Sequence, residues 1–118
     1  MGKKRRISRP AALRRRGRLV ADLPDLEQVL RGSLVTRYRR CGRANCRCAR
    51  EGDPGHGPAY YLMVSVGKGK TMEVYVPANQ KEEVEAWIAS FQRARETLEQ
   101  VSTINRTLLQ ERRLFDEE

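Results

Sequence analysis

Alternating apolar and polar residues predict a small antiparallel sheet. The runs 60–66 (YYLMVSV) and 71–76 (TMEVYV) flank the glycine-containing turn 67–70, which is the pattern of a β-hairpin. The earlier run 33–40 (SLVTRYRR) alternates in the same way and predicts a further strand. Its expected faces are Leu34, Thr36 and Tyr38 on one side, and Arg37 and Arg39 on the other. We therefore expect about three strands.

The last forty residues have the pattern of one long helix. Residues 79–118 contain neither Gly nor Pro, and Asn79 precedes Glu82 by three positions, as in a capping box. Apolar residues then recur at alternating spacings of three and four, as in a coiled coil. The first turns are expected to pack on the sheet. The run 101–105 (VSTIN) has poor helix propensity, which leaves a break there open.

The second half of this heptad seam predicts an interface with another helix. Asn105 occupies a seam position, where a buried amide fixes the register of a two-stranded coil. A homodimer is expected, and docking on a larger protein is the alternative. The residues expected to form the contact are Phe91, Leu98, Val101, Asn105 and Leu108.

A short helix is expected before the first strand. Asp22 has the residue type of a helix cap, Pro24 suits the first turn, and Gly32 would end the helix. Residues 1–18, by contrast, hold nine Lys or Arg and no acid. A block of like charges with little to bury predicts a disordered tail over residues 1–20.

Charge is unevenly distributed along the 118 residues, which carry a net +9. Residues 31–50 hold seven Arg and no acid, whereas residues 51–118 hold twelve acids and eight bases. Arginine binds phosphate through a two-pronged fork, so this distribution favours nucleic-acid binding over a merely solubilising charge. The residues expected to take part are Lys3, Lys4, Arg5, Arg6, Arg9, Arg14, Arg15, Arg16, Arg18, Arg37, Tyr38, Arg39, Arg40, Arg43 and Arg47.

All three cysteines and the only histidine lie within sixteen positions. They are Cys41, Cys46, Cys48 and His56, in a loop rich in Gly and Pro. Three thiolates and an imidazole are a Zn²⁺ ligand set, and four protein ligands leave no position for catalysis. The loop is therefore predicted to be a structural zinc site.

Other interpretations of this loop remain open. Glu51 or Asp53 could replace His56 as the fourth ligand, and the cysteines could be plain reduced thiols. A redox site is a further alternative, because the flanking arginines would favour thiolate. With its one histidine assigned to the metal and no paired carboxylates beside a plausible pocket, the chain is not expected to be an enzyme.

Composition bears on the cellular compartment and on the size of the hydrophobic core. An odd number of crowded cysteines argues against a disulfide framework and favours the cytoplasm. The sequence has no apolar run of membrane-spanning length, and its basic first residues, with no apolar stretch behind them, are not expected to be a signal peptide. At 39% hydrophobic residues and only seven aromatic ones, the core would be small, and a metal would stabilise it.

The run from Leu30 to Leu62 resembles a known family. Its most specific part is the segment Cys41-Gly42, Asn45-Cys46-Arg47-Cys48 and His56-Gly57-Pro58. The family consists of small bacterial proteins of unknown function, often encoded among mobile elements and transposases. The resemblance covers about residues 25–105 and implies a prokaryotic cytosolic protein associated with transposition. It implies no activity and no catalytic residues.

Together these patterns predict an α+β protein in three parts. A disordered basic tail (1–20) precedes a zinc-stabilised antiparallel β domain with a short N-terminal helix (21–78) and a long coiled-coil-like helix (79–118). The expected function is non-enzymatic binding of DNA or RNA, mainly through the phosphate backbone. The alternative function is that of an adaptor whose long helix docks on a nuclease or transposase.

Overall fold

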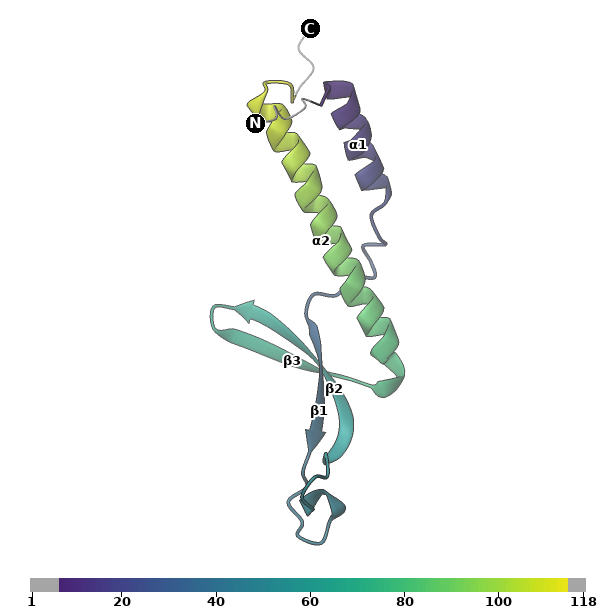
Figure 1. The fold of residues 1–118 in the computed structure, drawn as a ribbon, viewed down its shortest axis with the longest axis vertical. Helices are drawn as coiled ribbons and strands as arrows, with labels where there is room; N and C mark the ends of the chain where they lie inside the picture. Colours follow the sequence, from purple (N-terminus) through teal and green to yellow (C-terminus); the bar gives the residue numbers. More distant parts are fainter. Residues whose placement is uncertain (1–6, 115–118) are drawn as a thin grey trace. The chain divides into compact units, whose positions relative to one another are not determined.

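The computed structural model describes residues 7–114, which form two helices and a three-stranded sheet (Figure 1). In chain order the elements are α1 (Arg9–Ala21), β1 (Ser33–Arg39), η1 (Arg47–Ala49), β2 (His56–Gly67), β3 (Lys70–Val76), η2 (Ala78–Gln80) and α2 (Lys81–Gln110). They belong to two compact units. Of the described residues, one unit contains 7–28 and 90–114, and the other contains 29–89. No helix in the described part of the chain is both long enough and apolar enough to cross a membrane.

The sheet is antiparallel in the order β1-β2-β3, which confirms the predicted fold class. Leu34, Leu62 and Val74 lie opposite one another across the three strands. Because side chains alternate along a strand, these residues share one face. Leu62 and Val76 on that face are 5% and 4% exposed. The expected apolar pairing of the hairpin is therefore present.

The first turns of α2 attach to the sheet. The amide of Leu30 donates a hydrogen bond to the carbonyl of Trp87 at 3.1 Å. The Lys81 ammonium lies 4.9 Å from the centre of the Tyr60 ring, within the range of a cation–π contact. These contacts agree with the expectation that the start of the long helix packs against the sheet.

Helix α2 is continuous through residues 101–105, so the weak helix formers there do not break it. It ends at Gln110, eight residues before the end of the predicted helix. Arg112 has a left-handed backbone conformation (φ 56°), and the amide of Arg113 donates a hydrogen bond to the carbonyl of Leu108. A hydrogen bond of this kind is a common way to satisfy the last carbonyls of a helix.

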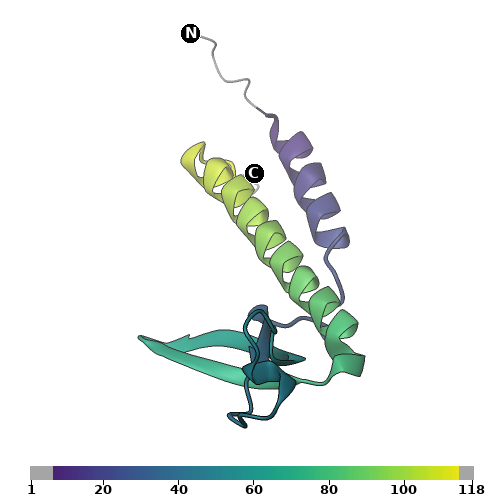
Figure 2. The same cartoon turned by 60° about the horizontal axis from the view of Figure 1, so that its bottom comes forward.

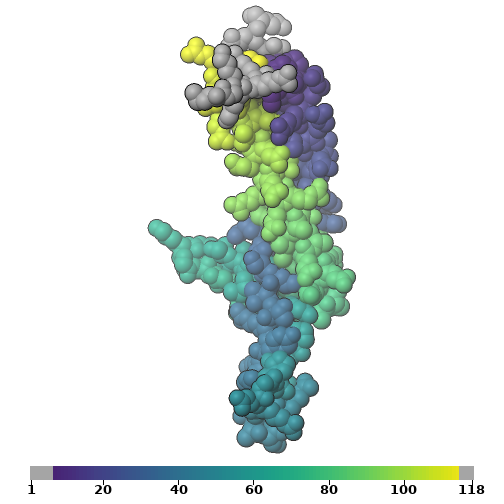
Figure 3. Space-filling model, viewed as in Figure 1, coloured from purple at the N-terminus to yellow at the C-terminus, as the bar shows by residue number. Residues whose placement is uncertain are grey.

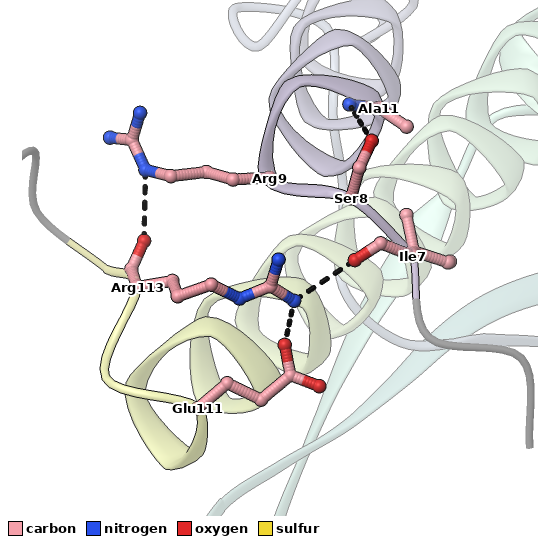
Figure 4. Close-up of polar contacts among 6 residues, drawn as sticks. All are labelled: Ile7, Ser8, Arg9, Ala11, Glu111 and Arg113. Atoms are coloured by element: carbon pink, nitrogen blue, oxygen red, sulfur yellow. Dashed lines mark hydrogen bonds and ion pairs between the residues drawn. The ribbon is translucent and has the colours of Figure 1, made fainter.

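The N-terminal region requires two corrections. Residues 9–20 were expected to be disordered but lie in α1, which begins after Ser8 with Pro10 in its first turn. The Ser8 hydroxyl accepts a hydrogen bond from the amide of Ala11 at 3.3 Å, as a helix cap does (Figure 4). The helix expected from Asp22 is absent. Instead the Asp25 carboxylate accepts a hydrogen bond from the Glu27 amide at 3.0 Å, a local turn that competes with a helix.

Helix α1 runs antiparallel to the C-terminal part of α2 (Figure 2), which supplies contacts that a short isolated helix lacks. Near the start of α1, Arg9 Nε donates to the carbonyl of Arg113 at 2.9 Å, and Arg113 Nη2 donates to the carbonyl of Ile7 at 2.9 Å (Figure 4). Near its end, Arg93 Nη2 donates to the carbonyl of Asp22 at 3.2 Å. The buried side chains of this helical hairpin are Ala12, Ala94 and Leu108.

Candidate metal centre

The four predicted ligands lie in the connection between β1 and β2. This connection, residues 40–55, is the metal loop; His56 follows as the first residue of β2 and lies opposite Arg39 in the register of the two strands. In the space-filling view the metal loop forms a separate lobe at the ends of these strands (Figure 3). Two strand ends held in one sheet therefore fix where the loop begins and ends.

The side chains of Cys41, Cys46, Cys48 and His56 converge, and they could hold a metal ion. Their ligand atoms all lie within 4.8 Å of one another. The Sγ atoms of Cys41 and Cys48 are 3.5 Å apart, and Cys46 Sγ lies 3.1 Å from His56 Nε2. A tetrahedral ion with metal–sulfur bonds of about 2.3 Å has S–S edges of about 3.8 Å. The observed separations are close to that requirement.

Hydrogen bonds to sulfur affect the pKa values of two of the three cysteines in opposite directions. The pKa of Cys46 is lowered to about 6, chiefly because the Cys48 amide donates to its sulfur, with further hydrogen bonds from the Cys41 and Cys48 thiols. The amide of Cys41 lowers the pKa of Cys48, but burial and the neighbouring thiols of Cys41 and Cys46 outweigh it and raise that pKa. Crowded sulfurs of this kind are held together as thiolates when a cation lies between them.

The side chain of Arg40 links two parts of the metal loop by hydrogen bonds. Its Nη1 donates to the carbonyl of Cys48, and its Nη2 donates to the carbonyl of Asp53 at 2.8 Å. The loop also passes very close to the β1 backbone at Gly55 (φ 98°), where a side-chain Cβ would lie 3.1 Å from the carbonyl oxygen of Arg39. The left-handed backbone and the close approach both require glycine at this position.

The geometry bears on two questions that the sequence left open, namely which residue is the fourth ligand and what lowers the pKa of a cysteine. Neither Glu51 nor Asp53 belongs to the ligand cluster among the described residues. The Asp53 carboxylate instead accepts a hydrogen bond from the amide of Gly55 at 2.8 Å, which shapes the turn before His56. The lowered pKa of Cys46 comes from hydrogen bonds to its sulfur, whereas the sequence pointed to the flanking arginines.

The arginines of β1 and the metal loop fall into two groups. Arg37 forms an ion pair with Glu73, and Arg40 binds loop carbonyls, so these two are engaged within the protein. The side chains of Arg39, Arg43, Arg47 and Arg50 are exposed, and none of them bonds to another residue in the part of the chain that the structure describes. Sequence reasoning did not include Arg50 among the nucleic-acid contacts. Its signal was present, because it is a seventh arginine in an acid-free stretch.

The basic residues of α1 also include some that bond within the protein and some that are exposed. Arg9 binds the carbonyl of Arg113, and Arg16 donates to the side chain of Asn105 at 2.8 Å. Arg14, Arg15 and Arg18 are exposed on the helix. Lys3, Lys4, Arg5 and Arg6 lie outside the described residues. Tyr38 is 53% exposed near the end of β1.

The residues expected to form a dimer seam do not all face outward. Leu108 is 1% exposed within the helical hairpin, and Asn105 accepts the hydrogen bond from Arg16. The length of α2 suggested a second chain, but α1 supplies a partner helix from the same chain. Phe91 and Val101 are half-buried, and Leu98 is 65% exposed.

The comparisons with known proteins bear on the family alone. No curated protein and no solved structure matches this chain. A family described as a domain of unknown function, DUF6788, matches residues 10–86, which include β1, the metal loop and the whole sheet. The chain therefore belongs to the DUF6788 family.

Proposed function

We propose that the chain is a zinc-containing, non-enzymatic protein that binds the phosphate backbone of nucleic acids. The observation that carries this proposal is the set of exposed, unengaged arginines Arg39, Arg43, Arg47 and Arg50 around a preformed ligand cluster. A metal in that cluster would hold the glycine-rich metal loop in one conformation. Arginines held in this way can bind phosphates at lower entropic cost than those of an unstructured peptide.

Zinc is the metal that the donors favour. Three sulfurs and one imidazole suit zinc, whereas magnesium and calcium prefer oxygen ligands. The ligand cluster uses the only histidine of the chain, and four protein ligands would leave the ion no open position. Both features support a structural role for the metal rather than an enzymatic one. Elemental analysis of the purified chain should find one zinc per chain.

The phosphate backbone is the expected ligand because DNA and RNA share it and because arginine forks match its geometry. The described residues contain no helix flanked by free basic side chains in a helix-turn-helix arrangement, which supports backbone contact over base reading in a groove. Arg14, Arg15 and Arg18 on α1 supply a second group of exposed cations in the other unit.

The resemblance to proteins encoded among mobile elements supports a role as an accessory protein in the bacterial cytoplasm. Reduced, closely spaced cysteines fit that compartment. If the role is correct, deleting the gene from its host should change the frequency of transposition of the neighbouring element. An unchanged frequency would remove this part of the proposal and leave the binding activity to be tested separately.

Paired charge neutralisation tests the binding proposal. The Arg43→Gln/Arg47→Gln variant should weaken binding to all sequences about equally and reduce the slope of log affinity against log salt by about one per arginine. The matched control is Lys68→Gln/Lys70→Gln, which removes the same charge at the turn between β2 and β3. Fluorescence anisotropy with a labelled oligonucleotide at several salt concentrations measures both. Equal losses in the two variants would show that only net charge matters.

A second candidate function is protein binding through α2. Leu98 and Leu109 are 65% and 60% exposed on this helix, and their spacing of eleven residues places them on one face. A second copy of the chain or a larger protein would cover them. Light scattering of the full chain should give twice the chain mass if they form a homodimer, and Leu98→Glu should then give a monomer. A monomeric wild-type chain would exclude the homodimer.

A further inference from the structure

The face of the sheet opposite Leu62 carries two tyrosines on adjacent strands. Tyr61 on β2 lies directly across from Tyr75 on β3, and their ring centres are 5.8 Å apart with the rings 70° from parallel. Because the Tyr61 ring is half-buried and Tyr75 is 61% exposed at an edge strand, Tyr75 is the ring that solvent reaches. An edge-on contact leaves part of the ring surface available for a further aromatic group.

Arg37 extends this surface from the other edge strand. Its guanidinium lies 5.2 Å from the centre of the Tyr61 ring, and its Nη2 pairs with Glu73 on β3 and contacts Met63 Sδ at 3.8 Å. Arg37 therefore covers Tyr61 and reaches across β2. Its Nε and Nη1 make no hydrogen bond to a residue that the structure describes. These donors remain available beside Tyr61, whose ring contacts that of Tyr75.

The charge around this surface favours an anionic partner. Between residues 29 and 89, which form this unit, the chain has ten Lys or Arg and six Asp or Glu, and one of those acids, Glu73, is paired with Arg37. An exposed aromatic ring beside a partly free guanidinium, within a net positive unit, matches the two needs of an unpaired nucleotide. The base stacks on the ring, and the phosphate binds the arginine.

We infer that Arg37, Tyr61, Glu73 and Tyr75 form a stacking platform for single-stranded nucleic acid, on which a base lies against the ring of Tyr75. This inference rests on the proposed nucleic-acid binding and adds the strandedness of the ligand and the place of the base. It assigns stacking to Tyr75, whereas the sequence pointed to Tyr38. Arg37 supplies the adjacent phosphate contact, and Glu73 limits that contact by holding one of its nitrogens.

An abasic strand separates stacking from charge, because it keeps every phosphate and lacks the bases. The zinc-loaded full chain is titrated against a labelled 12-nucleotide strand, its duplex and an abasic strand of equal length. Tyr75→Ala should weaken binding to the ordinary strand by about 5- to 150-fold, the range found for one stacked base. Its effect on the duplex and on the abasic strand should be negligible. Tyr75→Phe should retain binding, because the ring remains.

Two further variants sharpen the test. Met72→Ala is the matched control, because Met72 is 50% exposed on the opposite face of the same strand and should leave all three affinities unchanged. Glu73→Gln should strengthen single-strand binding and steepen its salt slope by about 0.7, the value for one more phosphate contact. Zinc content and circular dichroism verify the fold of each variant.

The outcomes distinguish this inference from the proposed function. Wild-type binding with no loss in folded Tyr75→Ala, or with an equal loss on the abasic strand, would overturn the platform and leave the arginine contacts standing. A wild-type chain that binds none of the three probes at 100 mM salt would overturn both. A loss confined to the strand that carries bases would support the platform.

Discussion

The metal loop and the helical hairpin are held together by different means. In the metal loop, Cys48 is 1% exposed and no apolar side chain of the loop other than cysteine is buried. The Arg40 hydrogen bonds hold the loop, and we propose that a bound metal adds to them. In the hairpin of α1 and α2, Leu108 is also 1% exposed, and the other buried side chains there, Ala12 and Ala94, are apolar as well. The sheet unit therefore has a cluster of side chains that could bind a metal, whereas the helical unit is held by contacts between two helices. The two units should therefore respond to different perturbations.

Removing a metal ligand should have the largest effect and should be confined to the sheet unit. Cys48→Ser is expected to abolish zinc binding and the cooperative unfolding of that unit, because the binding energy of a structural metal, about 10–16 kcal/mol in zinc-finger peptides, is also folding energy. The helical circular dichroism signal should largely persist. Elemental analysis and thermal unfolding measure these effects, with Ala44→Ser in the same loop as the control. Unchanged metal content would exclude Cys48 as a ligand.

Truncating a buried side chain of the helical hairpin should destabilise the helical unit and leave metal binding unchanged. Leu108→Ala should lower the free energy of unfolding by about 2–5 kcal/mol, because it leaves a cavity under α1. Leu109→Ala, next to it and 60% exposed, should cost less than about 0.5 kcal/mol. Urea unfolding followed by circular dichroism compares the two, and zinc content should stay at one per chain in both. Equal costs would show that α1 does not cover this face of α2.

Substitutions at Arg40 and Arg43 test the division between arginines that bond to other parts of the protein and arginines that do not. Arg40→Gln should weaken zinc binding by about 10- to 100-fold, as is typical when the support of a metal site is removed. Arg43→Gln should leave zinc binding unchanged and weaken oligonucleotide binding. Competition with a chromogenic chelator measures zinc affinity, and anisotropy measures the oligonucleotide. If Arg43→Gln lost zinc as readily as Arg40→Gln, the division would be wrong.

The smallest expected effect concerns the hydrogen bond between Arg16 and Asn105. A double-mutant cycle with Arg16→Ala and Asn105→Ala should give a coupling energy of about 1 kcal/mol. Asn105→Leu also separates two interpretations. In a coiled-coil seam this change raises stability, whereas in the intrachain hairpin it removes the partner of Arg16 and should lower stability. Thermal unfolding at two protein concentrations would detect either result.

The sheet and the ligand cluster were predictable because their signals are local. The strand period of residues 60–66 and 71–76 and the cysteine spacing depend on near neighbours in sequence. The pairing of α1 with α2 was not predictable in the same way. The hydrogen bond from Arg16 to Asn105 spans 89 residues, and α1 buries only Ala12 fully, so its sequence resembles a solvated tail. Partner choice for an amphipathic helix depends on distant residues.

The roles of individual arginines were also beyond the sequence. Arg39 and Arg40 are adjacent, chemically identical and both exposed, yet only the side chain of Arg40 bonds to the loop carbonyls. Only the path of the backbone around the ligand cluster decides between them. The same applies to the proposed choice of Tyr75 over Tyr38 for stacking, because both rings are exposed, at 61% and 53%, and only the fold brings Tyr75 against Tyr61.

The salt dependence of binding tests the central claim most directly, since it counts the phosphates that the unengaged arginines of β1 and the metal loop contact. The variant in which Arg39, Arg43, Arg47 and Arg50 are all changed to Gln should retain one zinc per chain. Its slope of log affinity against log salt on duplex should be less steep than that of the wild type by about 3 to 4, close to 0.9 for each lost phosphate contact. A variant that retains zinc and binds with the wild-type slope would contradict the account.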